Sequence, residues 1–294
     1  MEQKFYPLLF KIADTKSKKS QNIFIRLNIF ILLLLILSSV SSLYTTVPKN
    51  ITTFSTICLI LSTLFNIYIL FFRPEKSWYE GRAIAESVKT LTWKFITNTK
   101  PFKISLQQEK AEQIFNENLK KIIGQRRDFY ILIGQNYPDG NMISDEMISI
   151  RNCSFEERKK KYVEDRIQDQ INWYSYKTKQ NALNKNIALG LIIGFQILAI
   201  FFFIFEKNLF INYSFTSILI TMTSVFMTWL QLKRFQELTD AYGITATELK
   251  FIKEKSKFIL DDNQLEKYVD DTETAISREH TLWLARRDNI ELYK

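Results

Sequence analysis

Two consecutive uncharged runs decide the fold of this chain: LNIFILLLLILSSVSSLYTTVP, residues Leu27–Pro48, and NITTFSTICLILSTLFNIYILFF, residues Asn50–Phe72. Lys49 is the one charged residue between them. Each run is long enough to cross about 30 Å of hydrocarbon as a helix. The link between the runs is so short that it must be a tight turn. The two runs therefore predict a transmembrane helical hairpin rather than a cleaved signal peptide.

A second pair of uncharged runs follows later in the chain, Asn186–Phe205 and Asn208–Leu232, separated by Glu206 and Lys207. All 40 basic and all 31 acidic residues lie outside the four runs. A soluble domain spreads its charges more evenly, because each surface helix has a face in water. The pattern excludes a soluble globular protein. It predicts an all-α membrane protein with two transmembrane hairpins whose long helices extend into a cytoplasmic helical domain.

The basic residues predict the orientation of the hairpins. Of the 40 Lys and Arg residues, 38 lie outside the two hairpin turns, which hold only Lys49 and Lys207. Because loops rich in Lys and Arg stay on the cytoplasmic side, we expect both turns outside and both termini cytoplasmic. The net charge of +9 also suits contact with anionic lipid headgroups.

Local signals predict the helices of the polar segments. Pro74 is expected to end the second span, since proline interrupts a helix. Three capping-box patterns, with Ser at the N-cap and Glu or Gln three residues later, predict helix starts at Ser77, Ser105 and Ser154. No Pro or Gly occurs between Phe155 and Gly190, so one continuous helix is expected over Phe155–Phe205.

The C-terminal third is expected to contain two more helices. The fourth span should continue past Lys233 to about Phe258. A last helix, about Thr272–Asn289, should follow an acidic stretch, Asp261–Asp271, interpreted as a solvated turn rather than a cation site. The expected organisation is a cytoplasmic segment 1–27, a first hairpin with its following helix 28–100, a cytoplasmic helical region 101–152 and a second unit 153–294.

The two hairpin units share a plan, and a loose alignment supports it. Trp78–Lys89 (WYEGRAIAESVK) and Thr239–Lys250 (TDAYGITATELK) share Ala85 with Ala246 and Lys89 with Lys250. Each segment follows a hairpin, which is typical of an internal repeat.

Composition argues against an enzyme. The chain has one histidine and two cysteines, too few for a Cys/His zinc site. It has only seven glycines, and no glycine-rich phosphate loop occurs. His280 stands beside Glu279, but no second candidate accompanies it, so a packed helix residue is the better interpretation. We expect no catalytic residue, no metal site and no cofactor.

Polar residues form stripes on the second helix of each hairpin. In the fourth span they recur at intervals of three and four, which is one face of a helix. They could line an aqueous path or pack helices closely. The pore-lining candidates are Ser217, Thr221, Ser224 and Thr228, with Ser62, Thr63 and Asn66 of the second span.

Two further patterns allow alternatives. Gly190-Leu-Ile-Ile-Gly194 is a GxxxG pattern, and close approach of a helix from the same hairpin is favoured over an oligomer contact. Basic clusters could bind a phosphorylated signal or form ordinary solvated faces. The candidate ligand-binding residues are Arg126, Arg127, Lys159, Lys160 and Lys161.

Three segments together resemble the SLATT family, the SMODS and SLOG-associating two-TM effector domains, in a tandem four-span form. They are Trp78–Lys89 with Thr92-Trp93, then Arg166-Ile-x-x-Gln170-x-x-Trp173-Tyr174-x-x-Lys177, then Ala275-Ile-Ser-Arg278-Glu279-His280-x-x-Trp283. The resemblance implies a bacterial inner-membrane effector of antiphage defence and abortive infection. It also implies a signal from a partner nucleotidyltransferase.

The expected function is therefore an oligomeric ion channel or pore-forming effector in the lipid bilayer, gated by a nucleotide or oligonucleotide. A four-helix bundle is too narrow to hold an aqueous path alone, so a homo-oligomer such as a tetramer is expected. The alternative is a non-conducting membrane receptor or scaffold that recruits cytoplasmic partners.

Overall fold

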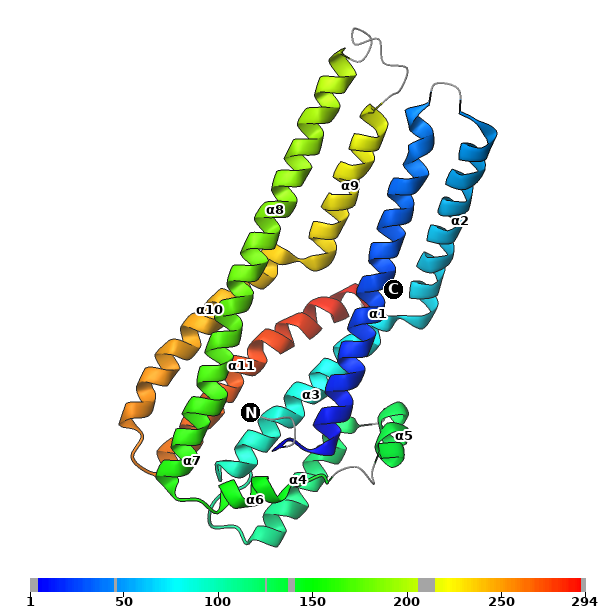
Figure 1. Ribbon diagram of the computed structural model, residues 1–294. Coiled ribbons are helices and arrows are strands. Elements are labelled where there is room, and N and C mark those ends of the chain that lie inside the picture. Colours follow the sequence, from blue (N-terminus) through cyan, green and yellow to red (C-terminus); the bar gives the residue numbers. More distant parts are fainter. Residues whose placement is uncertain (1–4, 45–46, 125, 137–140, 206–214, 292–294) are drawn as a thin grey trace. The chain divides into compact units, whose positions relative to one another are not determined.

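The computed structural model describes residues 5–44, 47–124, 126–136, 141–205 and 215–291, with side chains described as far as residue 277 (Figure 1). Every regular element in these ranges is a helix. The chain is an all-α membrane protein, as its uncharged runs predict. The described residues group into two compact units, each built from separate stretches of sequence.

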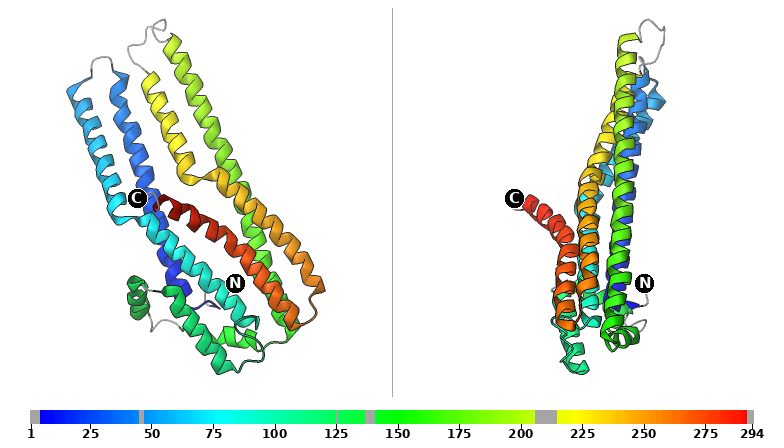
Figure 2. Two further views of the ribbon diagram at one scale, coloured as in Figure 1. Left: turned by 180° about the vertical axis from the view of Figure 1, so that it is seen from behind. Right: turned by 90° about the vertical axis from the view of Figure 1, so that its left-hand side faces the viewer.

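The first group, the membrane unit, consists of residues 20–75 and 177–240. Figure 2 shows its two antiparallel hairpins, with α1 beside α2 and α8 beside α9. Aromatic pairs join the helices of each hairpin: the ring centroids of Phe30 and Phe65 are 6.1 Å apart, and those of Phe195 and Phe226 are 5.6 Å apart. Its elements are α1 (Leu8–Ser38, of which the later part belongs here), the 3-10 turn η2 (Ser39–Leu43), α2 (Lys49–Phe72), the end of α8 (Asp169–Phe205) and α9 (Thr216–Lys233).

Three helical stretches are long and apolar enough to cross a membrane: Leu8–Leu43, Lys49–Phe72 and Phe155–Phe205. Only 11%, 17% and 17% of their most apolar segments are buried within the chain, so most of this apolar surface faces outward. The described part of the fourth span, α9, is not apolar enough to be counted with these three helices. Its mean hydropathy is lowered by its Ser and Thr residues and by Gln231 and Lys233 near its end. The expected start of the fourth span, Asn208, lies outside the described ranges.

The first hairpin leaves the membrane unit through a sharp break at Arg73. This residue is left-handed, with φ 42°, and its N–H donates to the carbonyl of Ile69 at 2.9 Å. The next helix, α3 (Pro74–Ile96), begins at the proline. Proline suits the first helical position, because its fixed φ fits the helix and its missing N–H is not needed there. Pro74 therefore ends the second span as predicted, but the predicted cap at Ser77 is wrong.

The second hairpin leaves in the same way. Arg234 is left-handed, with φ 51°, and its N–H donates to the carbonyl of Leu230 at 3.1 Å. The helix α10 (Phe235–Lys255) then starts a new direction. The predicted continuation of the fourth span past Lys233 is wrong, because a left-handed residue cannot continue a right-handed helix.

The second group, the helical body, consists of residues 1–19, 76–176 and 241–294 as far as they are described. Two predicted boundaries in this body are wrong. The helix α4 (Gln108–Ile123) has its N-cap at Gln107 rather than at Ser105, and the last helix begins at Asp262 and includes most of the acidic stretch. Besides α3 and α10, the body contains α4 (Gln108–Ile123), α5 (Arg127–Asn136), α6 (Asp145–Arg151), α7 (Phe155–Lys161), the π-helical segment η4 (Tyr162–Gln168), the 3-10 turn η5 (Ser256–Phe258) and α11 (Asp262–Glu291).

The elements α7, η4 and α8 form one uninterrupted helix over Phe155–Phe205, which confirms the prediction. Its start is the predicted capping box: Ser154 Oγ accepts from the N–H of Glu157 at 3.4 Å, and Glu157 Oε2 accepts from the N–H of Ser154 at 2.9 Å. The π-helical segment widens the helix locally. Tyr162, Arg166 and Ile167 are all buried there.

The internal repeat has a constant offset in the structure. The two left-handed arginines, Arg73 and Arg234, are separated by the same 161 residues as Ala85 and Ala246, which are both buried. The helix crossings also correspond. A Cβ added to Gly81 would lie 3.0 Å from the backbone oxygen of Ala13. The equivalent residues 161 positions later are Tyr242 and Tyr174, whose ring centroids are 5.5 Å apart. One repeat therefore packs small residues where the other packs two tyrosines.

Candidate functional site

The polar stripe of α9 lies on an outward face of the membrane unit. Ser217, Ser224 and Thr228 are exposed and Thr221 is half-buried, whereas Val225 on another face is buried. Within the described part of the chain, the stripe is therefore not buried between the helices of the hairpin.

The hydroxyl groups of this stripe donate to the backbone of their own helix. Thr221 Oγ1 donates to the carbonyl of Ser217 at 3.0 Å, and Thr228 Oγ1 to that of Ser224 at 2.8 Å. Ser224 Oγ donates to the carbonyl of Ile220 at 3.0 Å. Each hydroxyl donor is thus satisfied within the helix, while its oxygen keeps lone pairs that can accept from water.

The stripe predicted in α2 divides between two faces. Thr63 and Asn66 are exposed, but Ser62 is only 4% exposed. Ser62 belongs to a buried row of small residues with Ser55 and Cys58, which is typical of close helix packing in membranes. Thr63 and Asn66 remain the outward-facing candidates of this helix.

The glycine pattern of α8 faces open space within the described part of the chain. A Cβ added to Gly190 or Gly194 would meet none of the described atoms within 4 Å. The favoured interpretation, close approach of a helix from the same hairpin, is therefore wrong. The open glycines leave a surface on which a second helix can pack closely.

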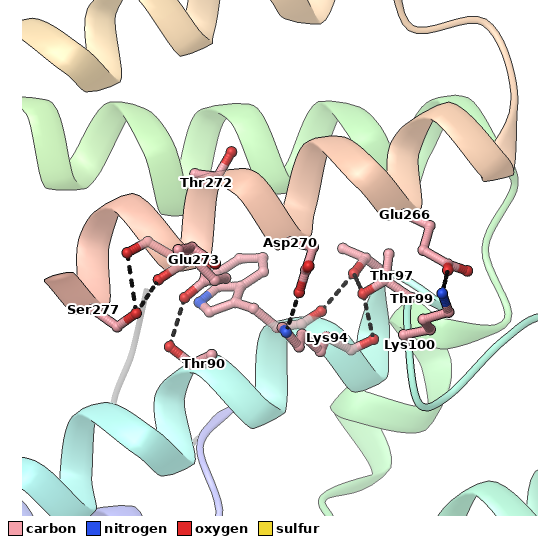
Figure 3. Close-up of polar contacts among 12 residues, drawn as sticks. Thr90, Lys94, Thr97, Thr99, Lys100, Glu266, Asp270, Thr272, Glu273 and Ser277 are labelled. Atoms are coloured by element: carbon pink, nitrogen blue, oxygen red, sulfur yellow. Dashed lines mark hydrogen bonds and ion pairs between the residues drawn. The ribbon is translucent and has the colours of Figure 1, made fainter.

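A buried ion pair lies in the core of the helical body. Arg166 and Glu273 have side chains that are each 1% exposed, and they form two parallel hydrogen bonds, Nε to Oε1 at 2.9 Å and Nη2 to Oε2 at 2.7 Å. Tyr162 Oη donates to Oε1 at 3.0 Å and Thr90 Oγ1 donates to Oε2 at 2.7 Å. Figure 3 shows Thr90 of α3 pointing to Glu273 of α11. Four bonds therefore saturate the carboxylate.

These contacts determine the charge of Glu273. Burial alone would raise the pKa of Glu273, but the charge of Arg166 and the hydrogen bonds from Arg166, Thr90 and Tyr162 outweigh it, and the pKa is lowered. The carboxylate is therefore ionised at neutral pH. Its contacts join α3, η4 and α11 in the core of the body.

Aromatic side chains surround this pair. Trp93 packs edge-to-face against Tyr162 with a centroid distance of 5.6 Å, and Trp93 Nε1 donates to Tyr6 Oη at 3.1 Å. Burial raises the pKa of Tyr6 to about 12. Tyr6, just before α1, is thereby fixed to α3.

The basic candidates are in two different situations. Arg126 Nη1 lies 3.4 Å from the carbonyls of Ile122 and Ile123 at the end of α4, and Arg126, Arg127 and Lys160 are exposed. Lys159 instead donates to the carbonyl of Ile259 at 2.8 Å, and Lys161 pairs with Asp165 at 3.3 Å. The structure does not gather the five residues into one cluster of free cations.

Two residues of the acidic stretch pair with basic residues of other helices. Asp262 accepts from the buried Arg158 at 2.8 Å and Asp270 accepts from Lys94 at 2.6 Å (Figure 3). In the described residues, no group of three His, Cys, Asp or Glu residues could hold a metal. The side chain of His280 lies outside the described part.

A small cavity of about 230 Å³ opens between the turn after α3, the start of α4 and the end of α6. It is lined by Asn98, Ile104, Leu106, Gln108, Arg151, Asn152 and Cys153. None of these residues was selected from the sequence, because the wall combines three segments with no shared motif.

Sequence reasoning also missed Glu273, although a signal existed. Glu273 lies four residues after the buried Val269 and three before the buried Ile276, so the three residues lie on one helical face. Arg166 likewise lies four residues from both Tyr162 and Gln170, which are buried. A charged residue on an otherwise buried helical face indicates a partner elsewhere, but not which partner.

Comparison with known families follows the two repeats. The model for SMODS and SLOG-associating 2TM effector domain 3 matches residues 7–159, and that for SMODS and SLOG-associating 2TM effector domain 1 matches residues 162–283. No curated protein and no solved structure matched the chain. The first match alone spans more than half of the chain, and the boundary between the two falls at the start of η4. The chain therefore belongs to the SLATT family of membrane effector domains associated with defence systems, as a tandem of two such domains.

Proposed function

We propose that this chain is an oligomeric ion channel or pore-forming effector of antiphage defence, gated by a nucleotide-type signal. The observation that carries the proposal is the outward-facing hydroxyl stripe of α9. Defence association supports the effector role, and the stripe supplies the physical basis for conduction.

The physical argument starts from the cost of an ion in hydrocarbon. A bare charge there costs many kcal/mol, so a conducting path must keep water or polar groups beside the ion. The uncharged run of the fourth span offers hydroxyl groups at Thr221, Ser224 and Thr228, whose donors are satisfied by the helix and whose oxygens still accept. A lumen of this kind is wet but carries no fixed charge.

An oligomer is part of the proposal. Two hairpins enclose too little space for a water-filled path, so copies must assemble around it. The open face at Gly190 and Gly194 suits a close helix contact between copies. The match to a two-span domain supports α9 as part of the fourth span.

The excess of Lys and Arg outside the turns supports a cytoplasmic location for the helical body. There it can receive a phosphorylated signal made by a partner nucleotidyltransferase. Of the five basic candidates, Arg126, Arg127 and Lys160 are exposed, while Lys159 and Lys161 would first have to leave their partners. The resulting localisation is a bacterial inner membrane with both termini inside.

Conductance in planar bilayers tests the proposal. We expect discrete conductance from the purified chain, and at least a tenfold loss when Thr221, Ser224 and Thr228 are all replaced by leucine. The matched control is Thr223→Leu, because Thr223 lies on another face and makes the same bond to its own helix, 2.9 Å to the carbonyl of Leu219. Crosslinking must show the same oligomer in every variant.

Two results would contradict the proposal. Unchanged conductance in the triple variant would make the stripe a packing or lipid-facing surface. Absence of conductance from an assembled wild-type oligomer, with and without signal nucleotides, would favour the alternative of a non-conducting receptor or scaffold.

A further inference from the structure

We propose that the cavity at the start of α4 binds a small phosphorylated molecule, up to the size of a mononucleotide. The site lies within the helical body and uses none of the basic residues selected from the sequence. For its regulatory consequence the inference rests on the proposed function, whereas binding itself does not.

The central observation is a buried arginine in the cavity wall that has no ion-pair partner in the described part of the chain. Arg151 is 5% exposed. Its Nη1 donates to the carbonyls of Phe95 at 2.7 Å and Phe102 at 3.1 Å, and its guanidinium lies 4.9 Å from the ring centroid of Phe95. These contacts orient one edge of the guanidinium and leave its Nε and Nη2 without a described partner.

Two other arginines in the described part of the body are buried, and each has an acidic partner. Arg158 is paired with Asp262 at 2.8 Å and Arg166 with Glu273 at 2.7 Å. Burying a cation without an anion is costly, so Arg151 is the one position among the three where the missing charge must come from elsewhere. Burial, with the nearby charge of Arg158, lowers the pKa of Arg151 to about 10, so the guanidinium remains charged at neutral pH.

The start of α4 contributes a second attraction for an anion. Gln108, its first residue, lies in the cavity wall, and the N-cap Gln107 makes no side-chain cap. The N–H groups of the first turn and the positive end of the helix dipole therefore remain available to a phosphate. One carboxylate acts on Arg151 from nearby, that of Glu112, and it already accepts from Gln108 Nε2 at 2.9 Å.

The remaining wall indicates the size and character of the ligand. Asn98 has a buried amide oxygen without a described partner, and its Nδ2 donates to the carbonyl of Arg151 at 3.0 Å. Ile104 and Leu106 supply an apolar side. A volume of about 230 Å³ is small for a ligand pocket, and it suits at most a mononucleotide rather than an oligonucleotide.

A cysteine in the wall provides a direct readout. Cys153 lines the cavity and is partly accessible, whereas the other cysteine, Cys58, is buried in α2. The test measures the rate of alkylation of Cys153 by a maleimide in the full-length protein in detergent. The probes are inorganic phosphate and AMP, with sodium chloride at equal ionic strength as the reference.

We expect both probes to slow alkylation of Cys153 at least fivefold, and AMP to act at lower concentration because it also covers Ile104 and Leu106. Gln108→Glu places a carboxylate in the wall and should raise the required probe concentration at least tenfold. A negative charge in the first turn favours the helix, so folding is retained. The matched control, Gln113→Glu, adds the same charge to an exposed position of α4 outside the cavity and should change nothing.

A second variant fills the cavity without adding charge. Leu106→Trp should abolish protection by AMP while the thermal midpoint of the protein stays within a few degrees of the wild type. Lack of protection in the wild type, or equal effects of Gln108→Glu and Gln113→Glu, would overturn the inference. Because alkylation reports only on the cavity, a protein that binds but does not conduct refutes the pore and not this site.

Discussion

Replacing Glu273 by glutamine preserves the shape of the side chain and removes the charge that faces Arg166. In the wild type this carboxylate accepts four hydrogen bonds and both partners of the ion pair are 1% exposed. The variant leaves a guanidinium buried without an anion, which costs about 3–5 kcal/mol. For a domain of this size, the midpoint of thermal unfolding should fall by about 6–20 °C.

The assay is thermal unfolding of the full-length protein in detergent, followed by tryptophan fluorescence. The matched control is Glu266→Gln on the same helix. Glu266 lies 3.5 Å from Lys100 and 3.7 Å from Lys103, which are both exposed lysines. Such pairs contribute at most about 1 kcal/mol, so this variant should be near the wild type. Equal shifts in the two variants would refute the assigned role of the buried pair.

Two extensions sharpen this test. A double variant, Arg166→Met with Glu273→Leu, leaves neither charge in the core and should be less destabilised than Glu273→Gln. The pH dependence follows from the lowered pKa of Glu273. The carboxylate stabilises the fold fully above its unfolded pKa of about 4.3, and this contribution is lost as the pH falls through the folded value. Glu273→Gln should flatten that acid limb.

Three further predictions concern other parts of the chain. Tyr6, whose pKa is raised to about 12, stabilises the fold below its unfolded pKa of about 10, and this contribution is lost as the pH rises from about 10 to about 12; Tyr6→Phe should therefore reduce the loss of unfolding free energy between about pH 10 and about pH 12, and an unchanged alkaline slope would contradict this. Gly81→Ala should destabilise the body by about 1–3 kcal/mol in denaturant unfolding, because the new Cβ would lie 3.0 Å from backbone atoms, whereas Gly134→Ala, with no described atom within 4 Å, should not. An impermeant thiol reagent added to intact cells should modify a cysteine at Lys49 and not one at Lys161; the reverse result would invert the proposed topology.

The spans could be predicted from the sequence because they depend on composition alone. A run without charge is apolar whatever it contacts, and two runs separated by only one or two charged residues can only form a hairpin. The helix Phe155–Phe205 could also be predicted from the sequence. Its start depends on a local capping box at Ser154, and its continuity depends on the absence of Pro and Gly before the third span.

The breaks and the core contacts depend on information that is not local. Pro74 marks the end of α2, but nothing comparable follows Arg234, so the second break was missed although it occurs at the equivalent position. The acidic residues at the start of α11 resemble a solvated turn until Arg158 and Lys94 approach them from distant segments. Arg166 and Glu273 are separated by 107 residues, a pairing that no local pattern contains.

The cavity illustrates the same limit. Arg151 is an ordinary charged residue in the sequence, and it becomes a candidate only because it is buried and no described acidic side chain pairs with it. By contrast, the hydroxyl stripe of α9 was visible in advance because helical periodicity alone places its members on one face. The structure adds that this face points away from the hairpin.

The constant offset of 161 residues between the repeats has a consequence for any assembly of this chain. Two unequal hairpins are covalently joined, so a closed ring of identical chains always contains an even number of hairpins, and the two kinds alternate around it. Duplication has thereby freed each copy to diverge: the tyrosines at positions 174 and 242 stand where the first copy holds Ala13 and Gly81. In the proposed pore, a chain with a single hairpin would repeat every substitution at each wall of the ring, whereas in this tandem chain a change in α9 would leave the proposed α2 walls as they were.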